Sequence, residues 1–394
     1  MSNMVEWKTI GEISYISDYV SNGSFASLRE NVQYKNDPDY AILVRFADYS
    51  NGFDKSKFVY IDEHAYNFLS KSSLEGGEII MSNVGSCGLL FRCPKLDRRM
   101  SLAPNSILIK SNYIDYLYYW LGSNAGQEEI KKITSKSAMP KFNKTEFKKI
   151  SIPIPSLSEQ TRIVGILDTF TSSIENLKQQ IAERRKQYEY YRDQLLDLEG
   201  KEKDDIHSWG DFCEMIKGNG VQKVDFIDSG RGCIHYGQIY THYGSFTYTT
   251  NKFVSEGVFE KARKASKGDI IMTDTSENVE DICKSVAYLG EDDIAVSNHA
   301  LIIKHQQNPK FLSFSTQTNS FFNQKRKVVV GVKVSGIKPE HLAQIKIYLP
   351  SLEEQSRIVS ILDTFEASIS NLEAQLKQRE KQYEYYRNKL LTFE

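Results

Sequence analysis

Few side chains in this sequence have the types and spacing that catalysis requires. Cys233 and His235 lie two positions apart, but two ligands do not complete a metal site, and packed or solvated pairs are more common. The sequence contains no GxxxxGK[ST] phosphate-binding loop and no GxGxxG dinucleotide turn. The segment from Asn36 to Tyr40 approaches the (N/D)PP(Y/F) pattern of amino-methyltransferases but lacks its second proline. We therefore expect no catalytic centre, cofactor or metal in this chain.

The elements that must position any binding residues are duplicated. The segment IPSLSEQTRIVGILDTF, which begins at Ile154, returns 195 positions later as LPSLEEQSRIVSILDTF, and KQYEYYR at Lys186 returns at Lys381. About 30 of the 48 residues in 152–199 are identical to their counterparts in 347–394. The preceding segments, 1–151 and 207–346, are similar in length but differ in sequence. This pattern predicts two different recognition modules on one repeated frame.

Each repeated segment is predicted to be a long helix. In both copies a serine stands three residues before a glutamate (Ser156 and Glu159, Ser351 and Glu354), which is the spacing of a capping box. Apolar residues then recur at alternating intervals of three and four, the pattern of helices that supercoil around one another. Each helix would extend about 60 Å at 1.5 Å per residue. The predicted seam consists of Ile163, Leu167, Phe170, Ile174, Leu177, Ile181, Arg184, Tyr188, Tyr191 and Leu195, and of Ile358, Leu362, Phe365, Ile369, Leu372, Leu376, Arg379, Tyr383, Tyr386 and Leu390.

We interpret the two helices as an antiparallel pair that packs along this seam, because a shared partner surface constrains both sequences alike. Two unrelated surface helices would leave their near-identity unexplained. Arg184 and Arg379 interrupt the seam, and such a polar position can fix the register of a helix pair. We thus predict a first module at 1–151, a spacer helix at 152–199, a linker at 200–206, a second module at 207–346 and a second spacer helix at 347–394.

The two modules keep similar segments in the same order. YAILVRFADY at 40–49 matches GCIHYGQIYT at 232–241, GEIIMSNVGSCG at 77–88 matches GDIIMTDTSENV at 268–279, and LAPNSILIK at 102–110 matches VSNHALIIK at 296–304. Trp7 and Trp209 each precede a turn rich in glycine and asparagine. Short β-branched runs between turn residues predict strands. The predicted fold class is therefore α+β, with two modules joined by two long antiparallel coiled-coil helices in a pseudo-twofold repeat.

Composition narrows the class of protein without deciding the function. The net charge is −1, but each module carries +2 and the remaining segments carry −5, which permits DNA binding without requiring it. The five cysteines are odd in number and form no CxxC pair, as expected in a reducing cytoplasm. We find neither an apolar run long enough to span a bilayer nor a signal-peptide core at the amino terminus.

The helix start PSLxEQxRIVxILD occurs twice, each time after a diverged module that contains G[ED]IIM. Over essentially the whole chain this arrangement resembles the specificity subunit of type I restriction–modification systems. The resemblance implies a non-catalytic subunit whose two target recognition domains each recognise one half of a bipartite double-stranded DNA site. It also implies that the helices set the spacing and dock two adenine methyltransferase subunits. S-adenosylmethionine, Mg and ATP would belong to partner subunits, which can include restriction subunits, in a bacterial or archaeal cytoplasm.

Given this resemblance, three places in each module carry side chains suited to base edges and phosphates. They are the loop after the first long strand, the turn after the G[ED]IIM strand and a basic stretch near the end of the module. The candidates are Arg45, Asp48, Ser82, Asn83, Ser86, Lys136, Lys141 and Asn143 in module one, and His235, Tyr236, Gln238, Thr273, Thr275, Ser276, Asn278, Lys325, Arg326, Lys327 and Lys333 in module two. The structural alternatives are an Arg45–Asp48 ion pair at the edge of the core and ordinary hairpin turns.

The repeated KQYEYYR motif offers one candidate for partner binding in each copy. Tyr190 and Tyr385 point away from the predicted seam and could contact a methyltransferase subunit. Two other functions stay open at this point. One is a non-catalytic coiled-coil adaptor with two protein-binding modules. The other is a self-sufficient DNA-modifying enzyme, which the missing catalytic motifs disfavour.

Overall fold

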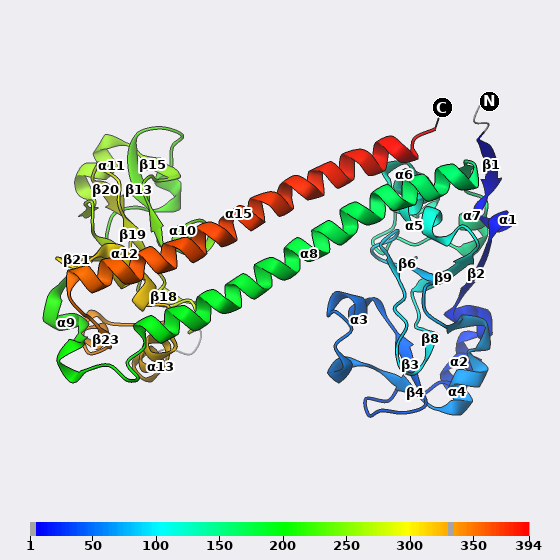
Figure 1. The fold of residues 1–394 in the computed structure, drawn as a ribbon, viewed down its shortest axis with the longest axis horizontal. Coiled ribbons are helices and arrows are strands. Elements are labelled where there is room, and N and C mark those ends of the chain that lie inside the picture. Colours follow the sequence, from blue (N-terminus) through cyan, green and yellow to red (C-terminus); the bar gives the residue numbers. More distant parts are fainter. Residues whose placement is uncertain (1–4, 330–334, 394) are drawn as a thin grey trace. The chain divides into compact units, whose positions relative to one another are not determined.

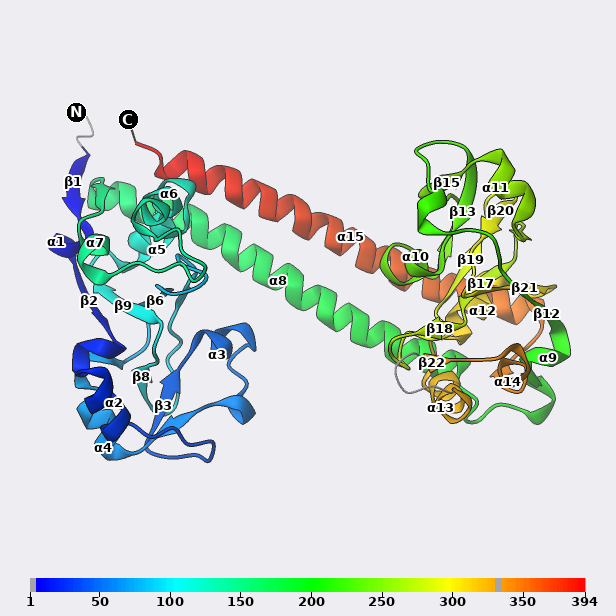
Figure 2. The same cartoon turned by 180° about the vertical axis from the view of Figure 1, so that it is seen from behind.

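The computed structural model describes residues 5–329 and 335–393. The chain forms two compact units (Figures 1 and 2). The first contains the residues up to Leu177 together with those from Gln375 onward, and the second is Lys178–Ala374. Each unit therefore combines one module with part of each long helix. The predicted division into separate modules and spacer helices stays a prediction.

In the first unit, module one is built from two sheets and several short helices. Its strands are β1 (Glu6–Thr9), β2 (Ser14–Asp18), β3 (Ala41–Val44), β4 (Tyr60–Ile61), β5 (Ser73–Leu74), β6 (Ile79–Ser82), β7 (Leu90–Arg92), β8 (Arg99–Leu102), β9 (Ser106–Ser111) and β10 (Ser151–Ile154). Its helices are α1 (Ile10–Ile13), α2 (Phe25–Asn31), α3 (Phe46–Ser50), α4 (Glu63–Phe68), α5 (Ile114–Gly122), α6 (Asn124–Ile133) and α7 (Lys144–Lys148). The sheets have the orders β2-β9-β6-β7 and β4-β3-β8-β5, and β1 pairs with β10.

In the second unit, module two follows the same plan. Its strands are β11 (Ile206–Ser208), β12 (Cys213–Lys217), β13 (Arg231–Ile234), β14 (Phe246–Thr247), β15 (Lys252–Val254), β16 (Lys264–Ala265), β17 (Ile270–Thr273), β18 (Thr275–Ser276), β19 (Ser285–Tyr288), β20 (Ile294–Val296), β21 (Ala300–His305), β22 (Ser335–Gly336) and β23 (Lys346–Tyr348). Its helices are α9 (Trp209–Phe212), α10 (Tyr236–Thr241), α11 (Glu256–Lys261), α12 (Pro309–Ser315), α13 (Asn319–Val328) and α14 (Pro339–Leu342). The sheets have the orders β12-β21-β17-β19-β14 and β15-β13-β20-β16.

The central strands of each module are buried on both faces. In β6, Ile79 faces a core that includes α5, while Ile80 faces the core beneath the second sheet. In β17, Ile270 and Ile271 divide in the same way between two cores. This double burial explains why both strands have continuous apolar sequences instead of alternating ones.

The order of the elements defines which positions of the two modules are equivalent. The strands β3 and β13, the helices α3 and α10, and the strands β6 and β17 correspond. The two tryptophans do not correspond. Trp7 lies in β1 and is 55% exposed, whereas Trp209 begins α9 and is fully buried, in the place that Ile10 takes in α1. The prediction that Trp7 and Trp209 occupy matching positions is therefore wrong, because residue type alone does not fix the register.

The two repeated segments form the long helices α8 (Leu157–Leu196) and α15 (Leu352–Leu391), as predicted. The capping box forms only in part. Ser156 Oγ accepts a hydrogen bond from the backbone N–H of Glu159 at 3.4 Å, but the Glu159 carboxylate binds the Arg162 guanidinium at 2.6 and 2.8 Å. The second copy makes the same contacts among Ser351, Glu354 and Arg357. A bidentate arginine one turn along the helix thus takes the carboxylate that we expected at the cap.

The two long helices pack against each other within each unit. In the first unit, Phe170 of α8 stacks on Tyr386 of α15, with ring centroids 5.4 Å apart. In the second unit, Phe365 of α15 stacks on Tyr191 of α8 at 5.5 Å. Phe170 lies early in α8 and meets a residue late in α15, so the helices are antiparallel. These contacts and the mixed helix and sheet content confirm the predicted fold class.

The seam residues nearest the start of each helix also join the core of a module. Ile163 and Leu167 are fully buried in the core of the first unit, and Ile358 and Leu362 are buried in the core of the second. The arginines that interrupt the seam cover aromatic rings. The Arg379 guanidinium lies 5.7 Å from the centre of the Phe170 ring, and that of Arg184 lies 5.8 Å from the centre of the Phe365 ring. These polar positions therefore take part in helix packing.

Candidate nucleic-acid interface

A hollow occurs at the equivalent place in each module. In module one it lies between α3, the turn after β6 and the turn before β9. In module two it lies between α10, the turn after β17 and the turn before β21. In module one it measures about 400 Å³, and its walls include Phe46, Ser86, Leu89 and Asn105. In module two it measures about 490 Å³, and its walls include Tyr236, Glu277, Asn278, Asp281 and His299. The two modules therefore present different side chains at equivalent places of the same arrangement of elements.

The first predicted contact place is a helix and not a loop. The backbone N–H of Arg45 donates to the Asp48 carboxylate at 2.8 Å, and that of His235 donates to the Gln238 side-chain oxygen at 2.7 Å. These equivalent bonds begin α3 and α10. Asp48 is fully buried and also binds the Arg45 guanidinium at 2.6 Å, a hydrogen bond that raises the pKa of Arg45. Asp48 and Gln238 therefore have structural roles, and the structure does not support direct DNA contact by either.

His235 is also largely enclosed. Only 6% of His235 is exposed, and burial lowers its pKa. Its Nδ1 accepts a hydrogen bond from the backbone N–H of Gly237 at 3.1 Å, so the ring supports the start of α10. Tyr236 packs on this ring with centroids 4.4 Å apart and meets His299 edge-on at 5.4 Å. Of this predicted pair, Tyr236 is the residue that reaches the hollow.

The second predicted place, the turn after the G[ED]IIM strand, is partly accessible. Ser82 and Thr273 are buried, and the Ser82 hydroxyl donates to the carbonyl oxygen of Val84 at 3.0 Å. Ser86 is exposed, Asn83 is half-buried, and Thr275 and Ser276 are also half-buried. Asn278 is exposed, and its amide donates to Asp281 at 2.8 Å. The role of these accessible residues in DNA binding stays a prediction, and Ser82 and Thr273 are removed from it by burial.

The third predicted place differs between the modules. Lys136 and Lys141 are exposed, and within the described part of the chain neither forms an ion pair. Asn143 is exposed, but its side chain caps α7 by accepting a hydrogen bond from the Glu146 N–H at 2.9 Å. Lys325–Lys327 lie in α13, which corresponds to α6 and not to the segment around Lys141. The two basic stretches are therefore not equivalent, contrary to our prediction.

Lys325 is buried, and only 4% of it is exposed. Its Nζ donates to the carbonyl oxygens of Glu280 at 2.8 Å and Ile282 at 2.7 Å, and burial lowers its pKa. The structure does not support a phosphate contact by Lys325, because Nζ would have to leave both carbonyl oxygens. Arg326 and Lys327 are exposed and stay predictions. Lys333 lies outside the described residues.

Sequence reasoning missed Asn105 and His299, which occupy equivalent turns before β9 and β21. Both have left-handed backbone angles, with φ of 67° and 65°. The carbonyl oxygen of Asn105 accepts a hydrogen bond from the backbone N–H of Asn83 at 3.2 Å, and Asp274 makes the same bond to His299. The matched segments LAPNSILIK and VSNHALIIK could have indicated these turns, because Asn and His are enriched among residues with positive φ.

The predicted partner-binding tyrosines of the long helices are accessible. Tyr190 is 60% exposed and Tyr385 is 59% exposed, so a partner could reach both rings. Over residues 5–329 and 335–393, no group of three or more His, Cys, Asp or Glu is placed to hold a metal ion. Nor does that part of the chain contain a helix with the length and apolar character needed to cross a membrane.

Comparisons with known proteins agree on one family. The family described as "Type I restriction modification DNA specificity domain" matches residues 4–184 and 206–381. A Haemophilus influenzae protein, described as a candidate type I restriction enzyme specificity subunit, is 28% identical over 99% of this chain and 96% of its own length. A type I restriction enzyme specificity subunit of Escherichia coli is 28% identical over 71% of each chain.

Two solved structures share the fold. The type I restriction–modification S subunit from M. genitalium has a TM-score of 0.56 and 15% identity, covering 100% of this chain and 98% of its own. A chain from a study of complex assembly and conformational transition of the type I R-M system has a TM-score of 0.61 and 15% identity, covering 98% and 96%. Because the family matches in both modules and in most of both long helices, the chain belongs to the type I restriction–modification DNA specificity family.

Proposed function

We propose that this chain is the non-catalytic DNA-recognition subunit of a type I restriction–modification complex, and that each module recognises one half of a bipartite double-stranded target. The observation that supports this most strongly is the pair of equivalent hollows with different walls. The hollow of module one has apolar walls at Phe46 and Leu89, whereas that of module two has acidic walls at Glu277 and Asp281. Apolar and acidic side chains suit different base edges, so modules with such different walls are suited to different sequences.

A selection experiment tests this proposal. The full chain, purified with the methyltransferase subunits that it is proposed to bind, is offered a pool of random-sequence DNA duplexes. The expected result is enrichment of two short, different sequence blocks separated by a spacer of fixed length and free sequence. Enrichment of a single block, or of none, would contradict the proposal.

We further propose that α8 and α15 set the distance between the two half-sites. Insertion of a heptad into both helices preserves the phase of the seam, which repeats every seven residues. The expected result is a new preferred spacer length in the selected duplexes, or loss of binding. Unchanged affinity for the original spacing would show that helix length does not determine it.

The helices are also proposed to dock two adenine methyltransferase subunits through the exposed tyrosines. In the complex, S-adenosylmethionine, Mg and ATP would belong to the methyltransferase and restriction subunits, in the cytoplasm. The variant Tyr190→Ala/Tyr385→Ala should capture less methyltransferase in a pull-down. Tyr248→Ala serves as the control, because Tyr248 is equally exposed at 60% but lies in module two. Equal capture by all three proteins would rule out this docking role.

A further inference from the structure

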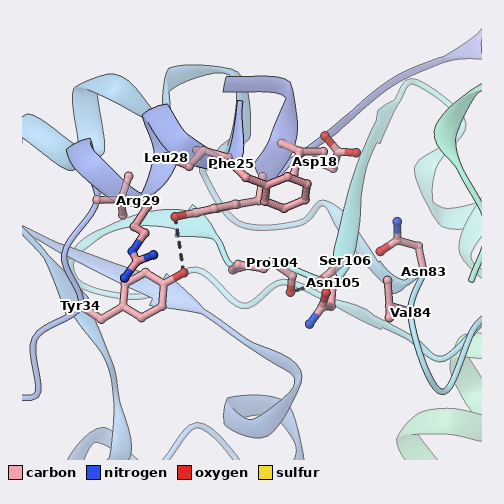
Figure 3. A pocket seen from close by; sticks show the side chains of 13 residues that line it. Asp18, Phe25, Leu28, Arg29, Tyr34, Asn83, Val84, Pro104, Asn105 and Ser106 are labelled. Atoms are coloured by element: carbon pink, nitrogen blue, oxygen red, sulfur yellow. Dashed lines mark hydrogen bonds between the residues drawn. The ribbon is translucent and has the colours of Figure 1, made fainter. Parts of the chain in front are cut away.

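A second hollow of module one adjoins the candidate interface. It measures about 460 Å³ and shares Val84, Pro104, Asn105 and Ser106 with the first hollow. Figure 3 shows Phe25 of α2 on one side and Pro104 and Asn105 across from it, with Asn83 and Val84 at one end. Phe25 is 82% exposed, an unusual position for a phenylalanine that belongs to no core. An exposed aromatic ring and an exposed amide thus lie on opposite walls of one apolar hollow.

The amide of Asn105 is exposed and available. Among the described residues, its side chain has no hydrogen-bond partner. Its backbone, in contrast, is fixed by the bond between its carbonyl oxygen and the N–H of Asn83 at 3.2 Å. Because the backbone is already fixed, only the side chain has conformational entropy to lose when the amide binds a ligand.

The charged groups of this hollow are already paired with neighbours or lie at its far end. Asp18 accepts a hydrogen bond from Lys144 Nζ at 2.8 Å and another from the Ser21 N–H at 2.8 Å. Arg29 lies beside Tyr34 at the end away from Asn83, as Figure 3 shows. The walls near Asn105 are therefore uncharged. They consist of the Asn83 and Asn105 amides, the Ser106 hydroxyl and apolar groups, which suit the edge of a base better than a phosphate.

We propose that module one recognises an A·T base pair here, with Asn105 bound to the adenine and the hollow beside Phe25 holding the thymine methyl group. This inference rests on the proposed function. An asparagine amide matches adenine N6 and N7 in the major groove, and apolar side chains contact the C5-methyl group of thymine. The two features lie on the same edge of an A·T pair, as the amide and the apolar walls lie in one hollow.

Module two has a different side chain at the equivalent place. There His299 replaces Asn105, and the hollow that His299 lines contains Glu277 and Asp281. Carboxylates of this kind accept a hydrogen bond from cytosine N4 and do not attract a methyl group. We therefore expect this particular A·T contact in the half-site of module one.

The test uses the full chain in complex with methyltransferase and the duplex that this complex selects from a random pool. Asn105→Gly removes the amide and keeps the turn, because glycine adopts positive φ without strain. The variant should lose preference at one A·T pair of one half-site, where wild type discriminates by about 5- to 150-fold. Replacing that adenine by 7-deazaadenine should weaken wild type but not the variant. His299→Gly is the matched control and should leave this preference intact.

Phe25 is tested separately with deoxyuridine in place of thymidine at the same pair, which removes only the methyl group. Wild type should bind the substituted duplex more weakly, whereas Phe25→Ala should bind both duplexes equally. An Asn105→Gly complex that keeps its full adenine preference throughout that half-site would overturn the inference. A wild-type complex that enriches no sequence would instead overturn the proposed function itself, so the two failures are distinct.

Discussion

The repeated helices and the two modules have diverged to very different extents. In each unit the same aromatic stack joins α8 and α15, with interplanar angles of 26° for Phe170–Tyr386 and 29° for Phe365–Tyr191. In the modules, by contrast, equivalent positions carry side chains of different chemistry. Packing between two repeats constrains both copies, whereas a surface that binds a ligand is constrained only by that ligand. This difference in divergence distinguishes the repeated helices, which pack against each other, from the module surfaces that are proposed to bind DNA.

At one position the two modules differ in a buried residue of the core. Lys325 in α13 occupies the position of Ile130 in α6, and both residues are buried. Ile130 packs among apolar side chains, while Lys325 binds two carbonyl oxygens of the segment that leads from the candidate interface back to β19. In module two, a core residue therefore holds a surface loop in place. Module one has an apolar contact at that position.

The largest expected effect comes from making the two modules alike at this position. Lys325→Ile would remove the donor that binds the part-buried carbonyl oxygen of Glu280 and the buried carbonyl oxygen of Ile282, which costs about 2 to 5 kcal/mol of unfolding free energy. Hydrogen exchange of the second unit, compared with wild type, measures the loss. Ile130→Val in the first unit is the control and should cost about 1 kcal/mol. A Lys325→Ile protein as stable as wild type would show that this segment does not depend on the lysine.

A smaller effect, equal in both units, is expected from the helix pair. Phe170→Ala and Phe365→Ala each remove a half-buried ring that stacks on a tyrosine and lies beneath an arginine, at a cost of about 2 kcal/mol. Because the contacts match, the two losses should agree within about 0.5 kcal/mol in urea unfolding. Clearly unequal losses would mean that the two helix contacts contribute different amounts to stability although their geometry matches. Tyr190→Ala, which removes an exposed ring, should change stability by less than about 0.5 kcal/mol.

The sequence predicted the frame well because its signal extends over many residues. A seam with ten positions per helix has only one consistent helical phase, and the structure places Phe170 and Phe365 on the contact surfaces. The short helices α3 and α10 were predicted as loops, because helices of five or six residues are too short to show a period. The burial of Lys325 depends on contacts with residues more than forty positions away, which a local charge run cannot reveal.

We also expect basic residues at non-equivalent positions of the two modules to make the electrostatic contribution to DNA binding. Lys136→Ala/Lys141→Ala alters the segment before α7, and Arg326→Ala/Lys327→Ala alters the end of α13. Each phosphate interaction that a substitution removes should flatten the slope of log affinity against log salt by about one. Filter binding of the selected duplex at several salt concentrations measures this slope. Lys55→Ala is the control, because Lys55 already pairs with Asp97 at 3.1 Å. An unchanged slope would exclude the altered pair from phosphate binding.

The smallest effect concerns a half-buried carboxyl group in α15 whose equivalent position in α8 has no carboxyl group. Glu366 of α15 accepts a hydrogen bond from the Ser245 hydroxyl at 2.6 Å, whereas the equivalent residue of α8 is Thr171. Burial raises the pKa of Glu366 above 4.5, and the nearby Asp363 raises it further, while Ser245, Lys310 and Tyr188 oppose these effects. Just above pH 4.5 the folded chain therefore binds more protons at this site than the unfolded chain.

Because the folded state holds the extra proton, this group makes stability fall as the pH rises through the window above 4.5. Glu366→Gln keeps the shape and a polar partner for Ser245 but cannot titrate, so its melting temperature should fall less over that window. Thr171→Val alters the equivalent position in the first unit without adding or removing a titrating group, and should leave the pH dependence as in wild type. A Glu366→Gln profile parallel to that of wild type would mean that the buried carboxyl does not couple folding to pH, and that this difference between the units has no energetic consequence.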